Sequence, residues 1–277
     1  MRDLLGRVCL VTGASSGIGR VTAEALAARG ARVWLACRDE SKTQPVLRAI
    51  AAAGGDASFV ALDLADLHSV EACARAVLAR SEPLHVLINN AGLAGKLGLT
   101  VQGFELAFGV NHLGHFALTH WLLPRLLEQA EARVVNVASL AHYNVDGIDF
   151  ERLRRPGNYF TVLRQYGVSK LANVLHAKEL ARRYGGQGLH AYALHPGVIA
   201  SDIWRQVPQP VRWWMTRSMI SNEAGAETSL YCATSPEVAD DNGLYYDECR
   251  IKEPSSAARN AELARELWQR SERYLDG

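Results

Sequence analysis

A tyrosine and a lysine four residues apart could exchange a proton with a substrate. Tyr166 and Lys170 stand in the stretch Tyr-Gly-Val-Ser-Lys, and residues four apart lie on one face of a helix, about one turn from each other. A free phenol has a pKa of about 10, whereas a general acid or base works best near the working pH. A neighbouring ammonium lowers the phenol pKa. The pair therefore predicts acid–base chemistry, with two unrelated surface residues as the alternative.

A glycine-rich turn near the amino terminus has the layout of a dinucleotide site. Arg7 to Val11 is predicted to form a short buried strand, and Arg20 to Arg29 a helix. Glycines between them would allow a tight turn, and a helix N-terminus holds a pyrophosphate. The expected cofactor contacts are Thr12, Gly13, Ser15, Ser16, Gly17, Ile18 and Gly19. The spacing Gly-x3-Gly-x-Gly differs from the G-x-G-x-x-G fingerprint, and a plain strand–helix loop is the alternative.

The end of the second predicted strand, Ala31 to Ala36, indicates which cofactor binds. Sites that select a free ribose 2′-hydroxyl usually place Asp or Glu there, but here Cys37 and Arg38 follow the strand. A guanidinium suits a 2′-phosphate, so Arg38 favours NADP(H). Asp39 could instead bridge Arg38, which would weaken this assignment.

Strands and helices alternate along the chain. Further strands are predicted at 57–62, 84–88, 133–138, 189–194 and 244–246, and helices at 41–53, 67–80, 102–129 (interrupted near Asn111 or Gly114), 166–184 and from about 255. This alternation predicts an α/β fold, a parallel sheet with helices on both faces, in one domain spanning residues 1–277. Ligands of such sheets bind beyond the carboxyl ends of the strands.

Composition limits the class of protein. Of 277 residues, 48% are hydrophobic and 21% charged, so a large core is expected; the net charge of +1 provides no field for nucleic acid or an anionic membrane. Five scattered cysteines without a CxxC spacing indicate reduced thiols and a cytoplasmic location. The first residues lack the apolar core of a signal peptide, and no apolar run is long enough for a transmembrane segment.

Taken together, these stretches resemble the short-chain dehydrogenase/reductase family over essentially the whole chain. The matching motifs occur in family order at 12–19, 89–92, 111, 139, 166–170 and 196–197. The stretches 36–38, 111–116, 169–173 and 195–198 are most similar to the retinol dehydrogenase-like branch. The resemblance implies a Rossmann fold with a doubly wound, mostly parallel seven-stranded sheet. It also implies NADP(H)-dependent interconversion of a small apolar alcohol and its carbonyl compound: a retinoid, long-chain aldehyde, steroid or polyketide-like ketone.

The resemblance also implies roles for individual residues. Tyr166 would exchange a proton with the substrate oxygen, and Lys170 would lower its pKa and hold the nicotinamide ribose. Ser139 would donate a hydrogen bond to the substrate oxygen, and Asn111 would fix a water leading from Lys170 to solvent. The remaining expected cofactor contacts are Asp63, Leu64, Asn89, Ala91, Gly92, Pro196, Gly197, Val198 and Ser201.

Two features depart from the family pattern. Tyr166 follows Ser139 by 27 residues, about twice the distance in the shortest family members, which indicates a functional loop. Ser201 stands where a threonine is often found, and it keeps the hydroxyl.

Two other protein classes share parts of this pattern. Sugar-nucleotide epimerases and dehydratases share Tyr-x3-Lys, but they usually have another glycine spacing and a larger C-terminal domain. Cofactor-binding regulatory or scaffold proteins on the same fold often lose the tyrosine or the lysine, and both are present here. The oxidoreductase remains the leading interpretation.

Two residue clusters have competing interpretations. His112, His115 and His120 are closely spaced, but no carboxylate or cysteine completes a zinc set, so we expect no metal site. The stretch 203–220 is rich in tryptophan and methionine. It is predicted to be a lid over an apolar pocket, with core packing or a contact in a homo-oligomer as alternatives.

Overall fold

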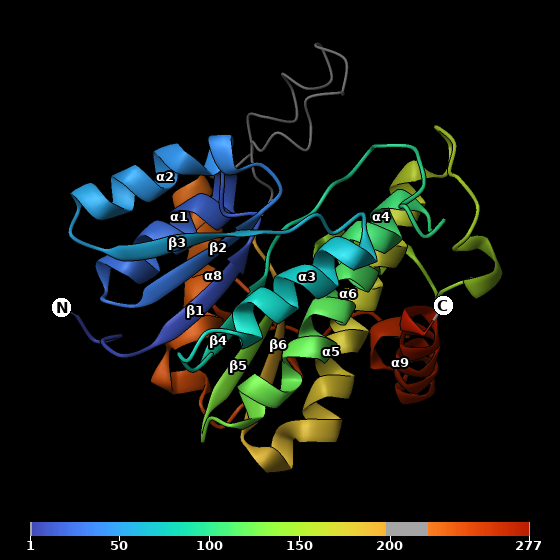
Figure 1. Ribbon diagram of the computed structural model, residues 1–277. Helices are drawn as coiled ribbons and strands as arrows, with labels where there is room; N and C mark the ends of the chain where they lie inside the picture. The colour runs from blue at the N-terminus through green and yellow to red at the C-terminus, as the bar shows by residue number, and fades with distance from the viewer. Residues whose placement is uncertain (1, 198–220, 277) are drawn as a thin grey trace.

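One twisted sheet runs through the protein (Figure 1). The computed structural model describes residues 2–197 and 221–276. The strand order is β3-β2-β1-β4-β5-β6-β7-β8. The strands are β1 (Val8–Thr12), β2 (Arg32–Cys37), β3 (Asp56–Ala61), β4 (Val86–Asn89), β5 (Ala132–Val137), β6 (Leu189–His195), β7 (Leu244–Asp247) and β8 (Arg250–Ile251). Strands β1 to β7 are mutually parallel, as predicted.

The predicted number of seven strands is one too low. The additional strand β8 has two exposed residues and pairs antiparallel with β7. The turn between them passes through Glu248 and Cys249, both at positive φ. Two residues are too few to show the alternation by which a strand is recognised in a sequence, so β8 could not be predicted.

Helices cover both faces of the sheet (Figure 1). Helices α1 (Gly17–Ala28), α2 (Glu40–Ala52) and α8 (Asn222–Thr234) cover one face, and α3 (Leu67–Leu78), α5 (Gly114–Leu127) and α6 (Val162–Tyr184) cover the other. Along β1, the side chains of Cys9 and Val11 belong to the core on the face covered by α1, α2 and α8, and that of Leu10 belongs to the core on the other face. This alternation buries β1 on both faces, as expected for a parallel sheet. The C-terminal helix α9 (Ala261–Leu275) packs on the outside of α6.

The predicted interruption of the long helix is present. A short helix α4 (Leu106–Phe108) leads into a π-helical turn, Gly109–Leu113, which continues directly into α5. π-Helical turns are rare and occur frequently at functional sites. Asn111 lies in the middle of this turn.

Some predicted features lie outside the described residues. These are Val198, Ser201 and the tryptophan-rich stretch 203–220. Within the described ranges, no helix is long and apolar enough to cross a membrane.

Candidate functional site

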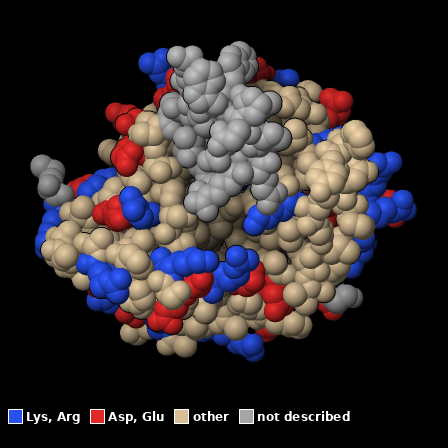
Figure 2. Space-filling view, turned by 90° about the horizontal axis from the view of Figure 1, so that it is seen from above, with Lys and Arg blue, Asp and Glu red and all other residues tan. Residues whose placement is uncertain are grey.

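A cavity of ≈ 680 Å³ opens at the carboxyl ends of the strands. Figure 2 looks down on this face, where a hollow opens near the centre of the molecule. The predicted site residues that line the cavity are Gly13, Ser15, Ser16, Gly17, Ile18, Gly19, Arg38, Asp63, Leu64, Ala91, Gly92, Tyr166, Lys170 and Pro196. Thr12, Asn89, Asn111, Ser139 and Gly197 do not line it. The cavity therefore joins the predicted dinucleotide turn and the predicted proton-transfer pair in one space.

The glycine turn fits closely against the loop after β4. A Cβ on Gly13 would lie 2.9 Å from the Cα of Ala91, and a Cβ on Gly19 would lie 2.5 Å from the carbonyl oxygen of Gly13 and would collide with the Asn90 side-chain amide. Glycine is needed at both positions because no larger residue fits.

The amino end of helix α1 suits an anionic group. Within the described residues, α1 has no capping side-chain hydrogen bond and no acidic residue in its first turn. Helices α2, α3, α8 and α9 are each capped by a side chain, from Asp39, Asp66, Ser221 and Asn260. Helix α6 also lacks a capping side chain and an acidic residue in its first turn, but only the amino end of α1 follows the glycine turn that lines the cavity. Uncapped amides at a helix N-terminus bind phosphate, so the glycine turn and α1 fit a dinucleotide.

Asn89 braces the sheet beneath the cavity. Its Nδ2 donates to the hydroxyl of Thr119 on α5, at 3.0 Å, and to Oδ1 of Asn136 on β5, at 2.8 Å. Both bonds are buried, so the side chain ties strand β4 to its neighbours and points away from the cavity.

Asn111 holds two elements together through its side-chain amide. Its Oδ1 accepts from the backbone N–H of Leu93 at 2.8 Å, and its Nδ2 donates to the carbonyl of Leu93 and the hydroxyl of Ser169, both at 2.9 Å. The side chain thus clamps the loop after β4 against α6. Its predicted role in fixing a water stays a prediction.

Ser139 and Tyr166 meet above the end of β5. Ser139 caps a short 3-10 helix, Leu140–Asn144. Burial raises the pKa of the Tyr166 phenol, and the Ser139 side chain opposes this shift. Gly167 makes this meeting possible, because a Cβ there would lie 2.8 Å from the carbonyl oxygen of Ala141. Sequence reasoning missed this role, although a glycine in the interior of a helix was the available signal.

The ammonium of Lys170 is buried beside the phenol. Lys170 is 4% exposed, and its Nζ donates to the carbonyl of Val137 at 2.9 Å. Burial lowers the pKa of Lys170 to about 8 because a charged group loses its hydration. Nζ lies 5.6 Å from the centre of the Tyr166 ring.

The pKa of Tyr166 shifts against the expectation from the sequence. Burial raises the phenol pKa, and this effect outweighs the opposing hydrogen bond with Ser139. The hydrogen bond of the Lys170 ammonium goes to the carbonyl of Val137, and the lowering of the phenol pKa by Lys170 stays a prediction. A lowered phenol pKa therefore requires a change in the surroundings of Tyr166.

The comparisons with known proteins agree with this arrangement. A family model described as short chain dehydrogenase matches residues 7–148. Human retinol dehydrogenase 11 is 44% identical over 271 residues, covering 96% of this chain and 85% of that protein. This chain belongs to the short-chain dehydrogenase/reductase family. It is retinol dehydrogenase-like, as predicted, and it is an oxidoreductase.

Further relatives cover nearly all of the chain. Human dehydrogenase/reductase SDR family member 13 is 43% identical over 284 residues, covering 99% of this chain and 74% of that protein. The crystal structure of an uncharacterized protein from Mycobacterium paratuberculosis has a TM-score of 0.80 and 36% identity, covering 99% of this chain and 96% of that one. A Beutenbergia cavernae structure with bound NADP, named as an NAD(P) dependent gluconate 5-dehydrogenase, has a TM-score of 0.73 and 26% identity, covering 89% and 96%. The family fold implies a nicotinamide cofactor.

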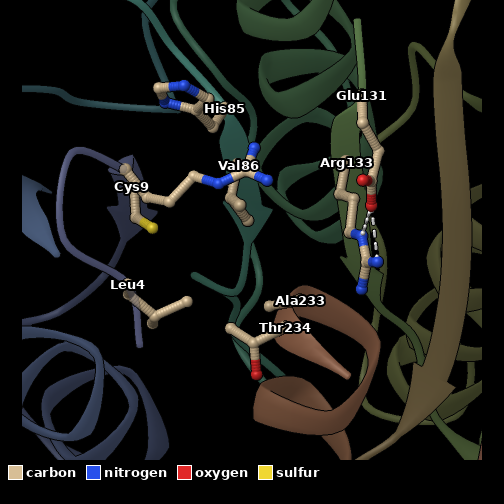
Figure 3. A pocket seen from close by; sticks show the side chains of 9 residues that line it. Leu4, Cys9, His85, Val86, Glu131, Arg133, Ala233 and Thr234 are labelled. Atoms are coloured by element: carbon tan, nitrogen blue, oxygen red, sulfur yellow. Dashed lines mark hydrogen bonds and ion pairs between the residues drawn. The ribbon is translucent and has the colours of Figure 1, made fainter. Parts of the chain in front are cut away.

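A much smaller cavity of ≈ 60 Å³ lies at the opposite edge of the sheet (Figure 3). Arg133 enters it, but its guanidinium is bound by Glu131 and by the carbonyls of Cys232 and Ser235. Burial raises the pKa of the Cys9 thiol to about 12, so Cys9 is not a reactive nucleophile. Neither the guanidinium of Arg133 nor the thiol of Cys9 is therefore available for chemistry in this cavity.

The close fit of the glycine turn yields a test of the site. Gly19→Ala should destabilise the fold by roughly 1–3 kcal/mol, as overpacking does, because the new methyl group meets Gly13 and Asn90. Gly147→Ala is the matched control, since nothing lies within 4 Å of a Cβ there, and it should change the free energy of unfolding by less than about 0.5 kcal/mol. Urea unfolding of both variants measures this. If Gly19→Ala and Gly147→Ala have the same free energy of unfolding, residue 19 has more room than the structure describes.

Proposed function

We propose that this protein is an NADP(H)-dependent oxidoreductase that interconverts an apolar alcohol and its aldehyde or ketone. The observation that carries the proposal is one cavity in which Tyr166 and Lys170 face an uncapped helix N-terminus across the carboxyl edge of the sheet. A proton-transfer group and a dinucleotide site must lie this close for hydride and proton to reach the same substrate carbon and oxygen. Neither a regulatory protein nor a scaffold needs that combination.

The proposed mechanism assigns one task to each residue. The cofactor supplies or accepts the hydride when bound. In reduction, Tyr166 donates its phenolic proton to the substrate oxygen, and the hydroxyl of Ser139 donates a hydrogen bond to the same oxygen. The ammonium of Lys170, protonated below a pKa of about 8, stabilises the phenolate that remains. In oxidation, the phenolate accepts the proton from the alcohol.

Contacts around Arg38 support the choice of NADP(H). Arg38 is exposed and lines the cavity. The neighbouring Asp39 binds other partners: its carboxylate accepts from the Ser41 hydroxyl at 2.7 Å and from the Lys42 amide at 3.2 Å, and it pairs with the Lys42 ammonium. Asp39 is therefore engaged in capping α2, which leaves the guanidinium of Arg38 to a 2′-phosphate.

A retinoid is the first substrate class to test. The relatives described above include human retinol dehydrogenase 11, and the proposed substrate is apolar. A sugar-nucleotide epimerase or dehydratase is the second candidate, because it shares the Tyr-x3-Lys pair. It would be revealed by turnover of a nucleotide sugar without net consumption of the nicotinamide cofactor.

Tyr166→Phe tests the proton donor. The variant should bind NADPH as wild type does, while kcat for NADPH oxidation with retinal or long-chain aldehydes should fall at least about 100-fold, the size of general acid–base catalysis. Tyr159→Phe makes the same chemical change at an 86% exposed position seven residues earlier, and it should behave as wild type. A fully active Tyr166→Phe would exclude this mechanism.

Arg38→Asp tests the choice of cofactor. The carboxylate should repel the 2′-phosphate and accept hydrogen bonds from the ribose hydroxyls, so the preference should shift from NADPH towards NADH. Dissociation constants of both cofactors, measured for wild type and variant, give the result. If wild type binds NADH as tightly as NADPH, Arg38 does not select the cofactor.

A further inference from the structure

The imidazole of His115 connects the two halves of the site. His115 stands in the first turn of α5 and is 1% exposed. Its Nδ1 lies 2.9 Å from the carbonyl oxygen of Asn111, and its Nε2 lies 2.9 Å from the hydroxyl of Thr12 at the end of β1. His115 does not line the cavity, so any effect on the reaction passes through these two neighbours.

The hydrogen bonds determine which ring nitrogen carries the proton. A carbonyl oxygen can only accept, so Nδ1 of His115 carries the hydrogen and donates it to Asn111. Burial lowers the pKa of His115 to about 4, so the ring is neutral at neutral pH and Nε2 is an acceptor. The Thr12 hydroxyl then donates its one hydrogen to Nε2, a shorter contact than the 3.4 Å to the carbonyl of Ile88.

The hydroxyl of Thr12 in turn holds the loop that faces the glycine turn. Its oxygen accepts from the backbone N–H groups of Asn90 and Ala91, both at 2.9 Å. Asn90 and Ala91 line the cavity and touch the positions of Gly13 and Gly19. The direction of the Thr12 hydroxyl, fixed by His115, therefore bears on the shape of the proposed dinucleotide site.

The other side of the imidazole leads to the proposed proton donor. Asn111 donates from its amide to the Ser169 hydroxyl at 2.9 Å, and Ser169 donates to the carbonyl of Tyr166 at 2.8 Å. Hydrogen bonds thus link the loop after β4 through Thr12 and His115 to the backbone carbonyl of Asn111, and the side chain of the same Asn111 links through Ser169 to the backbone carbonyl of Tyr166.

We infer that His115 is a positioning residue, held as the Nδ1–H tautomer, that fixes the position of the cofactor turn relative to the Tyr166 helix. This inference rests on the proposed function, because that relative position matters only if cofactor and proton donor act on one substrate. It separates His115 from His112, three residues earlier, which packs against Phe108 with ring centres 5.1 Å apart and lies 3.3 Å from the Ser271 hydroxyl on α9.

His115→Phe is the first variant, and His112→Phe is its matched control. Both remove a buried imidazole from the same helical region, but only the first breaks the bonds to Thr12 and Asn111. We expect His115→Phe to raise the NADPH dissociation constant at least about tenfold, the effect of one unsatisfied buried partner. His112→Phe should leave it within about twofold. Fluorescence titration with NADPH, without substrate, measures both at a temperature where each variant is folded.

Two further variants separate positioning from general damage to the core. His115→Gln offers an acceptor near the place of Nε2, so it should restore NADPH binding to within about threefold of wild type. Thr12→Val removes the hydroxyl, and combined with His115→Phe it should weaken binding no more than the worse single variant. If His115→Phe does not fold, His115→Gln and Thr12→Val still decide the matter.

The outcomes distinguish this inference from the proposed function. If wild type does not bind NADPH, the proposed function fails. If wild type binds NADPH but His115→Phe binds it equally well, or His112→Phe weakens binding as much, His115 serves only packing and the inference is wrong. Multiplicative losses in the Thr12→Val/His115→Phe variant would also overturn it.

Discussion

A buried positive charge is the constraint on which the site depends. Lys170 is 4% exposed, and none of the ion pairs among the described residues includes it. Burial of an ammonium without a carboxylate is costly, and the lowered pKa of Lys170 reflects that cost. The carbonyl of Val137 is its hydrogen-bond partner, and Asn173 donates to the same oxygen at 3.2 Å. The end of β5 and helix α6 are therefore held together at the point where the proposed chemistry occurs.

The parallel sheet explains why distant residues meet around this charge. The carboxyl ends of parallel strands share one edge, so the turn after β1, the loop after β4 and Ser139 after β5 converge there. Buried amide and hydroxyl groups fix their relative positions: Asn89 joins β4 to β5, and Asn111 joins the loop after β4 to α6. In a low-dielectric interior, such satisfied polar groups specify one arrangement.

Most of the fold could be predicted because its signals are local. Buried strands, the glycine turn and the Tyr-x3-Lys pair each occupy a few consecutive residues. The observed strands β1 to β7 match the predicted ones, and the glycine turn and the Tyr-x3-Lys pair both line the cavity. The glycine at 167, inside a helix, indicated a close contact, but its partner Ala141 could not be predicted because it lies in a different segment of the chain. His112 and His115 are only three residues apart in the sequence, yet their imidazoles contact different residues, Ser271 and Thr12 respectively. Their directions depend on the π-helical turn, whose exact extent the sequence does not indicate. The raised pKa of Tyr166 was missed because it results from burial of the phenol, which depends on how segments distant in sequence pack around it.

The most direct test of the central claim is whether Tyr166 and Lys170 act as one unit. The measurement is kcat for retinal reduction at saturating NADPH in wild type, Tyr166→Phe, Lys170→Met and the double variant. If the ammonium acts on the reaction through the phenol, its loss has no further effect once the phenol is gone, since residues that act as a unit show non-additive effects. The account predicts a double variant about as slow as Tyr166→Phe alone. Losses that multiply in the double variant would contradict it.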